Sequence, residues 1–344
     1  MTACLRILEP GFAATIQDCG RVGYQRFGVP VSGALDAISL EIANVLVGNA
    51  PCAGAIELLR TGLSFEVEAE SVTLALAGTA APLSVETGKA SVRVPPFRSM
   101  IAWRGDILKI PPPNGGAVCY LAVGGGFDIP RSLGSVSTYR RAQLGGYRGR
   151  ALAAGDRLPL RLDACERPIV FLDLNIKAPA VLQTVRGPNA EYFTASAFRT
   201  FYSATYSVAP ASDRMGLRLA GLPLERSIQG ELPSQGTTAG GIQVPSGGHP
   251  ILLLADRQTT GGYPRIATLI GACIAGAGRL TPGMEVRFEE VTRDKAVRLL
   301  RAQREWLGSL PSLLQPAPAT ALSTERLLSE NLIDGVTAGS LGEG

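Results

Sequence analysis

The sequence predicts a mainly β protein built from two related halves. The 344 residues include 41 glycines and 24 prolines, which indicates many tight turns, as in all-β folds with short strands. Short apolar or alternating segments bounded by turn residues supply the strands, and one such segment recurs later in the chain. Hydrophobic residues make up 46% of the chain, which is enough for a full core.

Individual elements follow from the spacing of apolar residues. The segments with strand patterns are 5–8, 63–67, 72–77, 107–110, 118–123, 251–255 and 286–289. Helical periodicity covers residues 35–47 and 293–307, and a shorter helix is expected over residues 190–201. Asp36 stands near the start of the first helix, where a carboxylate suits the free amides and the helix dipole.

In the repeat, the segment "IPPPNGGAVCYLAVGGGFDIPRSLG" resembles the later segment "VPSGGHPILLLADRQTTGGYPRIATLIG". Gly115 and Gly247 are 132 residues apart, and Pro130 and Pro264 are 134 apart. A second pair, "GRALAAGDRLPL" and "GRLTPGMEVRF", follows in the same order, and chance is the alternative explanation. Two copies predict units at residues 1–165 and 166–304. A flexible tail rich in Pro and Ala is expected at residues 305–344, with a possible short helix at 324–333.

Composition and charge exclude several classes of partner. The net charge of +4 is spread along the chain without a basic block among aromatics, so we expect no nucleic acid. No apolar run approaches the ~20 residues of a membrane helix, so we expect no membrane span. The first ten residues lack the basic-then-apolar pattern of an export signal, which favours the cytoplasm.

Cysteine and histidine usage argues against a metal site. The six cysteines form no C-x-x-C pair, and free thiols in a reducing cytosol explain their irregular spacing best. The single histidine, His249, lies in a predicted turn, where we expect it on the surface. Because it is the only histidine, a Ser-His-Asp catalytic triad would have to use it.

Three Gly-rich segments concentrate polar residues, and each can also be explained by a purely structural role. Residues 15–36 end at the predicted first helix and could bind an anion, or they could form a turn and a helix cap. Residues 133–150 combine hydroxyls with Arg140 and Arg141, which suits an anion or a solvated loop. The strongest is "SDRMG", residues 212–216, together with "ADRQTTGGYP", residues 255–264, because the latter follows an apolar strand and carries more polar groups than a turn needs. No Walker or dinucleotide motif indicates ATP or NAD binding.

The chain resembles the biotin-dependent carboxyltransferase family. The motifs that carry the resemblance are, in order, "QDCGRVGY", "GVPVSGALD", "ANVLVGN", "LGSVSTYRR", "LGGYRGR", "SDRMGLRLAG", "GGIQVP" and "ADRQTTGGYP". This family includes allophanate hydrolase subunit 2, the C subunit of 5-oxoprolinase (the Kip antagonist) and the carboxyltransferase domain of urea amidolyase. The likeness covers about residues 5–296, with small departures at Ala14 and Leu35.

The resemblance implies two tandem cyclophilin-like β-barrel units with a few short helices and a site between the units. The candidate site residues occupy positions that match the family motifs. Arg257, which follows Asp256 in the chain, is added to them. The candidate catalytic residues are Asp36, Asp256, Gln258, Thr259 and Tyr263. The candidate substrate-binding residues are Ser32, Ser137, Thr138, Asp213, Arg214, Gln243 and Arg257. No metal is expected. Arg214 or Arg257 is expected to hold a substrate carboxylate.

The resemblance implies an enzyme subunit that acts on a small polar amide or lactam. The expected function is that of the C subunit of an ATP-dependent 5-oxoprolinase, which opens 5-oxoproline to glutamate with a cyclophilin-like B subunit and a separate A subunit. One alternative is a carboxyltransferase that moves a carboxyl group to urea or a related amide. Its carboxybiotin would be carried on another chain, because no A-M-K-M signature occurs here. The other alternative is a regulatory protein that antagonises a kinase inhibitor resembling the B subunit.

Overall fold

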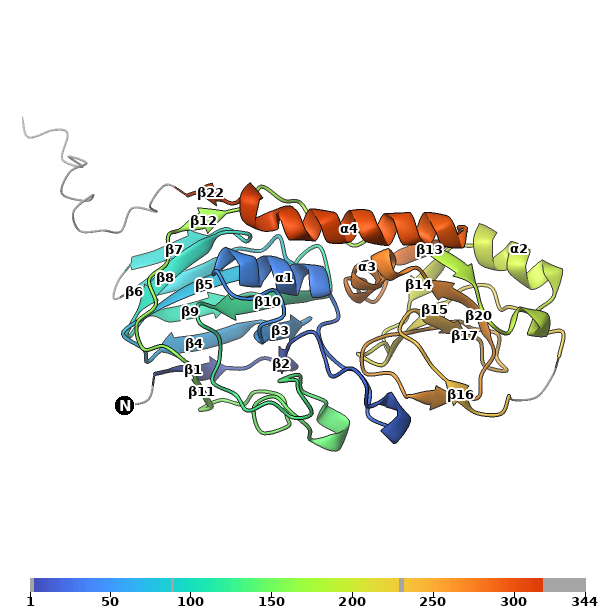
Figure 1. The fold of residues 1–344 in the computed structure, drawn as a ribbon, viewed down its shortest axis with the longest axis horizontal. Helices are drawn as coiled ribbons and strands as arrows, with labels where there is room; N and C mark the ends of the chain where they lie inside the picture. Colours follow the sequence, from blue (N-terminus) through green and yellow to red (C-terminus); the bar gives the residue numbers. More distant parts are fainter. Residues whose placement is uncertain (1–2, 88–89, 229–231, 318–344) are drawn as a thin grey trace, which may run out of the picture.

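The structure is a computed structural model that describes residues 3–87, 90–228 and 232–317. Within these residues, two β-rich units lie side by side and one long helix crosses both (Figure 1). The predicted mainly β class is therefore confirmed. The helix considered at residues 324–333 lies outside the described residues.

The first unit consists of two antiparallel sheets that share one apolar core. The first sheet has, in spatial order, the strands β11 (Arg157–Pro159), β1 (Cys4–Glu9), β4 (Leu63–Val67), β9 (Ile107–Ile110), β6 (Leu83–Thr87) and β7 (Ala90–Val94). The second has β2 (Ala14–Gln17), β3 (Ala55–Leu59), β10 (Val118–Val123), β5 (Ser71–Ala77) and β8 (Ser99–Trp103).

Strand β10 shows how the sequence builds this layering. All six of its residues are buried, as expected of an apolar strand covered on both faces. Because side chains alternate along a strand, Cys119, Leu121 and Val123 join the core between the two sheets. Tyr120 and Ala122 point the other way, into an apolar cluster that continues under the first helix and into the second unit.

The second unit contains a closed barrel of seven strands. Around the barrel these are β13 (Val181–Arg186), β20 (Arg265–Leu269), β17 (Gly241–Gln243), β18 (Ile251–Leu253), β15 (Gly216–Ala220), β14 (Tyr206–Val208) and β21 (Glu285–Glu290). A short pair, β16 (Gln235–Gly236) and β19 (Thr260–Gly261), lies beside it. The expectation of two tandem barrels is not confirmed, because the described strands of the first unit form two separate sheets.

In the described part of the chain, four α-helices accompany the sheets: α1 (Ala37–Leu46), α2 (Ala195–Ser203), α3 (Ile274–Gly278) and α4 (Arg293–Leu313). The 3-10 turns are η1 (Gln25–Phe27), η2 (Arg140–Ala142), η3 (Ala190–Tyr192) and η4 (Gly271–Cys273). Helix α1 begins as predicted, since the Asp36 side chain caps it by accepting a hydrogen bond from the Ser39 backbone N–H at 3.2 Å.

Helix α4 continues beyond residue 304, where the tail was expected to begin. It runs along both units in Figure 1 and leads into β22 (Gln315–Pro316), which pairs with β12 (Val170–Phe171) of the connecting segment. Trp306, Leu307 and Leu314 pack against the apolar cluster, and Leu310 is fully buried. Apolar side chains at helical spacing therefore extend the helix into the Pro- and Ala-containing segment.

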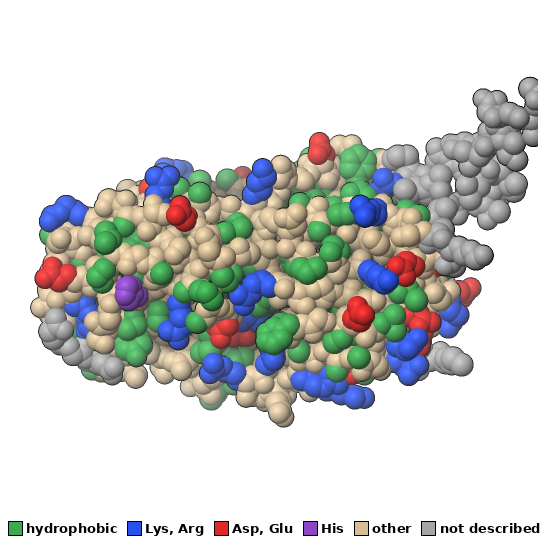
Figure 2. All heavy atoms as spheres, turned by 180° about the vertical axis from the view of Figure 1, so that it is seen from behind, with side chains coloured by type: hydrophobic (Ala, Val, Ile, Leu, Met, Phe, Trp, Pro, Cys, Tyr) green, Lys and Arg blue, Asp and Glu red, His purple; other side chains and the backbone are tan. Residues whose placement is uncertain are grey.

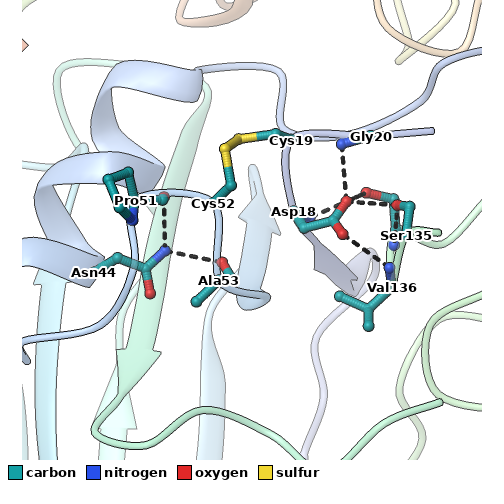
Figure 3. Close-up of a disulfide and its surroundings, with 10 residues drawn as sticks. Asp18, Cys19, Gly20, Asn44, Pro51, Cys52, Ala53, Ser135 and Val136 are labelled. Carbon is teal, nitrogen blue, oxygen red and sulfur yellow. Dashed lines mark hydrogen bonds between the residues drawn. A yellow bond between two sulfur atoms is a disulfide. The ribbon is translucent and has the colours of Figure 1, made fainter. Parts of the chain in front are cut away.

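A disulfide joins Cys19 to Cys52, with 5.3 Å between their Cα atoms (Figure 3). The prediction that all six cysteines are free thiols is therefore wrong for this pair, while Cys4, Cys119, Cys165 and Cys273 are free. A separation of 33 residues gave no sequence signal. The two residues meet only because the loop after β2 folds against the loop after α1.

His249 is exposed, as predicted, and its purple side chain is visible on the surface in Figure 2. In the described part of the chain, no helix is both long and apolar enough to cross a membrane. Within the same residues, no group of three or more His, Cys, Asp and Glu side chains is arranged to hold a metal ion.

Candidate functional site

The Gly-rich segment before α1 lies directly against the second unit. The backbone N–H of Ser32 donates to the Ala255 carbonyl oxygen at 3.2 Å. The Gly33 carbonyl oxygen accepts from Arg214 Nη2 at 2.7 Å. The motifs "GVPVSGALD" and "ADRQTTGGYP" therefore meet at the junction between the units, although more than 200 residues separate them in the sequence.

Arg214 occupies the centre of this junction. Its Nε and Nη2 donate to the two carboxylate oxygens of Asp256 at 2.8 and 3.2 Å, and its Nη1 donates to Glu57. Burial opposes the charge of Arg214, but the carboxylates of Asp256 and Glu57 more than offset that effect and raise its pKa. Each guanidinium nitrogen already has a protein acceptor, so Arg214 is arranged to position Asp256 rather than to hold a substrate carboxylate.

Glu57 was missed by the sequence reasoning. It lies on β3, is fully buried, and also accepts from the Tyr120 hydroxyl at 2.6 Å and the Leu35 backbone N–H at 3.0 Å. Burial and the nearby Glu57 carboxylate raise the pKa of Tyr120 well above its ordinary value, so its hydroxyl stays a donor. The available signal was one acid inside the apolar strand "AIELL", because a buried carboxylate requires a charged or hydrogen-bonding partner.

Asp36 makes a second ion pair across the junction. Its carboxylate accepts from Arg279 Nε at 2.6 Å and Nη2 at 2.9 Å, while Ser39 Oγ donates at 2.5 Å. The side chain is fully buried and lines neither cavity described below. The structure therefore places this predicted catalytic residue in a structural position, where it caps α1 and ties the first unit to the end of α3.

Two adjacent cavities open beside the Arg214 cluster. The larger has a volume of about 600 Å³ and the smaller about 220 Å³. Arg141, Asp213 and Met215 line both. The cavities therefore meet along one edge, formed by the "SDRMG" segment and by the arginine loop of the first unit.

The larger cavity combines both signs of charge. Asp213, Arg214 and Asp256 line it from the second unit, and Arg60, Arg140 and Arg141 line it from the first. The exposed ring of Phe12 stands at its wall. The arginines of the predicted loop at residues 133–150 thus face a cavity.

The smaller cavity gathers residues of "ADRQTTGGYP". Arg257, Gln258 and Tyr263 line it together with Gln243 and Asp213. Arg257 is 5% exposed, and its Nη1 donates to the Leu254 carbonyl oxygen at 3.3 Å. Its Nε has no hydrogen-bond partner in the described part of the chain, and burial lowers the pKa of this side chain.

Two other predicted residues, Ser137 and Thr138, line neither cavity. Ser137 is buried in the first unit and donates to Asp18 Oδ1 at 2.5 Å, and Thr138 donates to the Ile16 carbonyl oxygen at 3.0 Å. The Asp18 carboxylate also accepts from Ser135 Oγ at 2.6 Å (Figure 3). These hydroxyls hold the loop rather than face a ligand.

Two further candidates also lie outside the cavity walls. Ser32 has a left-handed backbone with φ of 55° and a buried hydroxyl without a partner among the described residues, but it lines neither cavity. Thr259 also lines neither, and its carbonyl oxygen accepts from the Thr237 N–H at 2.9 Å. Of the twelve predicted residues, the structure gathers Asp213, Arg214, Gln243, Asp256, Arg257, Gln258 and Tyr263 around the two cavities.

The sequence of the chain matches the family model "Carboxyltransferase domain, subdomain A and B" over residues 27–290. This chain belongs to that family. It is 35% identical over 310 residues to the 5-oxoprolinase C subunit of Escherichia coli K12, covering 89% of this chain and 97% of that protein. It is 34% identical over 312 residues to the protein of the same name from Haemophilus influenzae, covering 88% and 96%. Urea amidolyase of Saccharomyces cerevisiae is 32% identical over 328 residues, which are 89% of this chain but 18% of that protein.

Solved structures agree with this relationship. The crystal structure of TTHA0988 matches with a TM-score of 0.75 and 33% identity, covering 84% of this chain and 55% of that one. The Kluyveromyces lactis urea amidolyase matches with a TM-score of 0.80 and 25% identity, covering 94% and 20%. The chain thus spans less than two thirds of each of these solved chains.

Proposed function

We propose that this chain is the C subunit of an ATP-dependent 5-oxoprolinase, which opens 5-oxoproline to glutamate together with partner chains. The observation that carries the proposal is the match to two proteins named as that subunit over 97% and 96% of their length. In the reaction, one water adds across the lactam C–N bond, and a second converts ATP to ADP and phosphate. The proposed partners are a cyclophilin-like B subunit and a separate A subunit, in the cytoplasm.

The geometry of the larger cavity supports lactam chemistry. A lactam is a poor electrophile, so its opening requires groups that are fixed before the reaction begins. Arg214 fixes the Asp256 carboxylate through two hydrogen bonds at the cavity wall. Asp213 Oδ1 accepts from the Met215 N–H at 2.8 Å, which orients a second carboxylate at the shared edge. We assign these two residues, rather than Asp36, to orienting the lactam N–H or the attacking water.

The charge of the larger cavity fits an anionic co-substrate. Arg60, Arg140 and Arg141 line one side, and guanidinium groups bind phosphate and carboxylate oxygens well. These arginines would contact the phosphates of ATP, with the rest of the nucleotide site on a partner chain. When bound, ATP supplies the free energy that drives ring opening.

A second candidate function is a carboxyltransferase that uses carboxybiotin from another chain. It is favoured by the likeness to urea amidolyase, which extends over 94% of this chain. Urea or a related amide would be the acceptor. The same arginines fit the carboxyl group of carboxybiotin by charge.

One set of reconstitutions tests the proposal. The purified chain and the proposed A and B subunits are mixed in all combinations, and ADP release is measured with and without 5-oxoproline. We expect little 5-oxoproline-dependent release from this chain alone and full release from the three together. Activity only with urea and a biotin-carrying carboxylase would favour the second function. Tight binding to the B subunit without turnover of either substrate would favour a regulatory role.

A further inference from the structure

We propose that the smaller cavity is a carboxylate subsite and that Arg257 is its anchor. The ligand class is a small molecule with a carboxylate next to an amide. Naming that molecule as 5-oxoproline rests on the proposed function, whereas the anion site itself rests on the geometry around Arg257.

Arg257 differs from its neighbour Arg214 in one decisive respect. Both residues are buried, with Arg214 9% and Arg257 5% exposed. Arg214 is neutralised by two carboxylates, but Arg257 donates only to a backbone carbonyl oxygen, and its Nε has no acceptor among the described residues. A buried cation without an anionic partner is costly, and such groups concentrate at functional sites.

The remaining wall of the cavity suits a carboxylate. Gln243 is 7% exposed, and Gln258, Thr260 and Tyr263 add amide and hydroxyl groups that can donate hydrogen bonds. Arg141 and Arg218 also line the cavity, so three cations face one acid, Asp213.

The position of Asp213 orients the ligand. Asp213 stands at the edge shared with the larger cavity, so like-charge repulsion directs a carboxylate away from that edge and toward Arg257. The amide end of the molecule then faces Asp213 and Asp256, where the proposed chemistry occurs. A volume of about 220 Å³ admits a small ring. Urea has no carboxylate and would not use Arg257.

Paired ligands that differ only in the carboxylate test the subsite. The dissociation constants of 5-oxoproline and of the neutral lactam 2-pyrrolidinone are measured by calorimetry, on the full chain and on its complex with the A and B subunits. We expect the wild type to prefer 5-oxoproline by about 10- to 100-fold, the range expected for hydrogen bonds to a charged group. Arg257→Gln should abolish that preference, and Arg257→Lys should restore part of it. Arg301→Gln, which removes an exposed arginine from α4, is the matched control and should keep the preference.

Thermal unfolding separates a binding role from a structural one. Removing a lone buried cation should leave the melting temperature of Arg257→Gln equal to or above that of the wild type. Added 5-oxoproline should stabilise the wild type and not the variant. A large fall in melting temperature, with the preference between the two lactams unchanged, would show that Arg257 is structural.

The subsite and the proposed function can fail separately. Equal affinity of the wild type for both lactams, no detectable binding of 5-oxoproline, or an unchanged preference in Arg257→Gln would overturn the subsite even if the complex hydrolyses ATP with 5-oxoproline. Conversely, carboxylate-dependent binding through Arg257 without 5-oxoproline-dependent turnover would leave the subsite in place and refute the proposed function.

Discussion

Replacing Asp256 with alanine tests the Arg214 cluster directly. The change removes two of the hydrogen bonds to the Arg214 guanidinium and leaves Glu57 and the Gly33 carbonyl oxygen as its acceptors. Breaking a buried ion pair by removing one partner costs about 3–5 kcal/mol. Because Glu57 remains, we expect the lower end, about 3 kcal/mol, which corresponds to a fall in melting temperature of roughly 4 °C for a chain of 344 residues.

An exposed ion pair of the same chemistry is the control for stability. Arg186 Nε contacts Glu290 Oε1 at 2.8 Å, but the two side chains are 59% and 39% exposed. Glu290→Ala should therefore cost no more than about 1 kcal/mol. Both variants are unfolded thermally and in denaturant under the same conditions. If Asp256→Ala destabilises no more than Glu290→Ala, then Asp256 does not hold Arg214.

Asp256→Asn separates the structural role from the chemical one. The amide keeps the size of the side chain and one oxygen acceptor, so it should cost less stability than alanine. If the carboxylate orients the lactam or the water, turnover by the complex should still fall by about 100-fold or more. Wild-type turnover in a folded Asp256→Asn variant would remove Asp256 from the chemistry.

Three further predictions concern other parts of the chain. Cys52→Ser, or reduction of the bond to Cys19, should lower stability by up to about 3–4 kcal/mol, as expected for a loop of this length, and a reductant should not shift the variant's melting temperature. Hydrogen bonds from Arg157 and from Cys4 lower the pKa of Glu68 to about 2. Its ionised form therefore stabilises the fold at neutral pH, and that contribution is lost as the pH falls toward 2. Glu68→Gln should therefore lower the melting temperature at pH 7 and match the wild type near pH 2. Asp36→Ala should destabilise the chain by removing the α1 cap and the partner of a buried arginine, while leaving the Km for 5-oxoproline unchanged in the folded fraction.

Local elements were predictable because their signals lie in neighbouring residues. The strands β4, β9 and β10 occupy the predicted ranges, and α1 starts at the predicted cap. The end of α4 was not predictable from the sequence, since Leu310 and Leu314 are held by packing against distant elements. The division of the first unit into two separate sheets also depends on pairing between strands that are far apart in the sequence. Hydrophobic periodicity carries no information about that pairing. Duplication of one unit remains a prediction.

The residues that line the two cavities were predictable where polar residues follow a strand in a dense cluster, as in "ADRQTTGGYP". It was not predictable where the sequence left the direction of a side chain open. The hydroxyls of Ser137 and Thr138 suit a ligand or a buried carboxylate equally well, and the fold directs them to Asp18 and the Ile16 carbonyl oxygen. The disulfide and the partner of Arg214, Glu57, depend on contacts between segments far apart in the sequence.

The most direct test of the proposed function and its subsite is 5-oxoproline-dependent ADP release by the three-chain complex, measured with the wild type and with Arg257→Gln. We expect turnover that requires all three chains, and a large rise in the Km for 5-oxoproline in the variant. Turnover by this chain alone would contradict the shared assembly. Absence of 5-oxoproline-dependent turnover in the complete complex would contradict the proposed function.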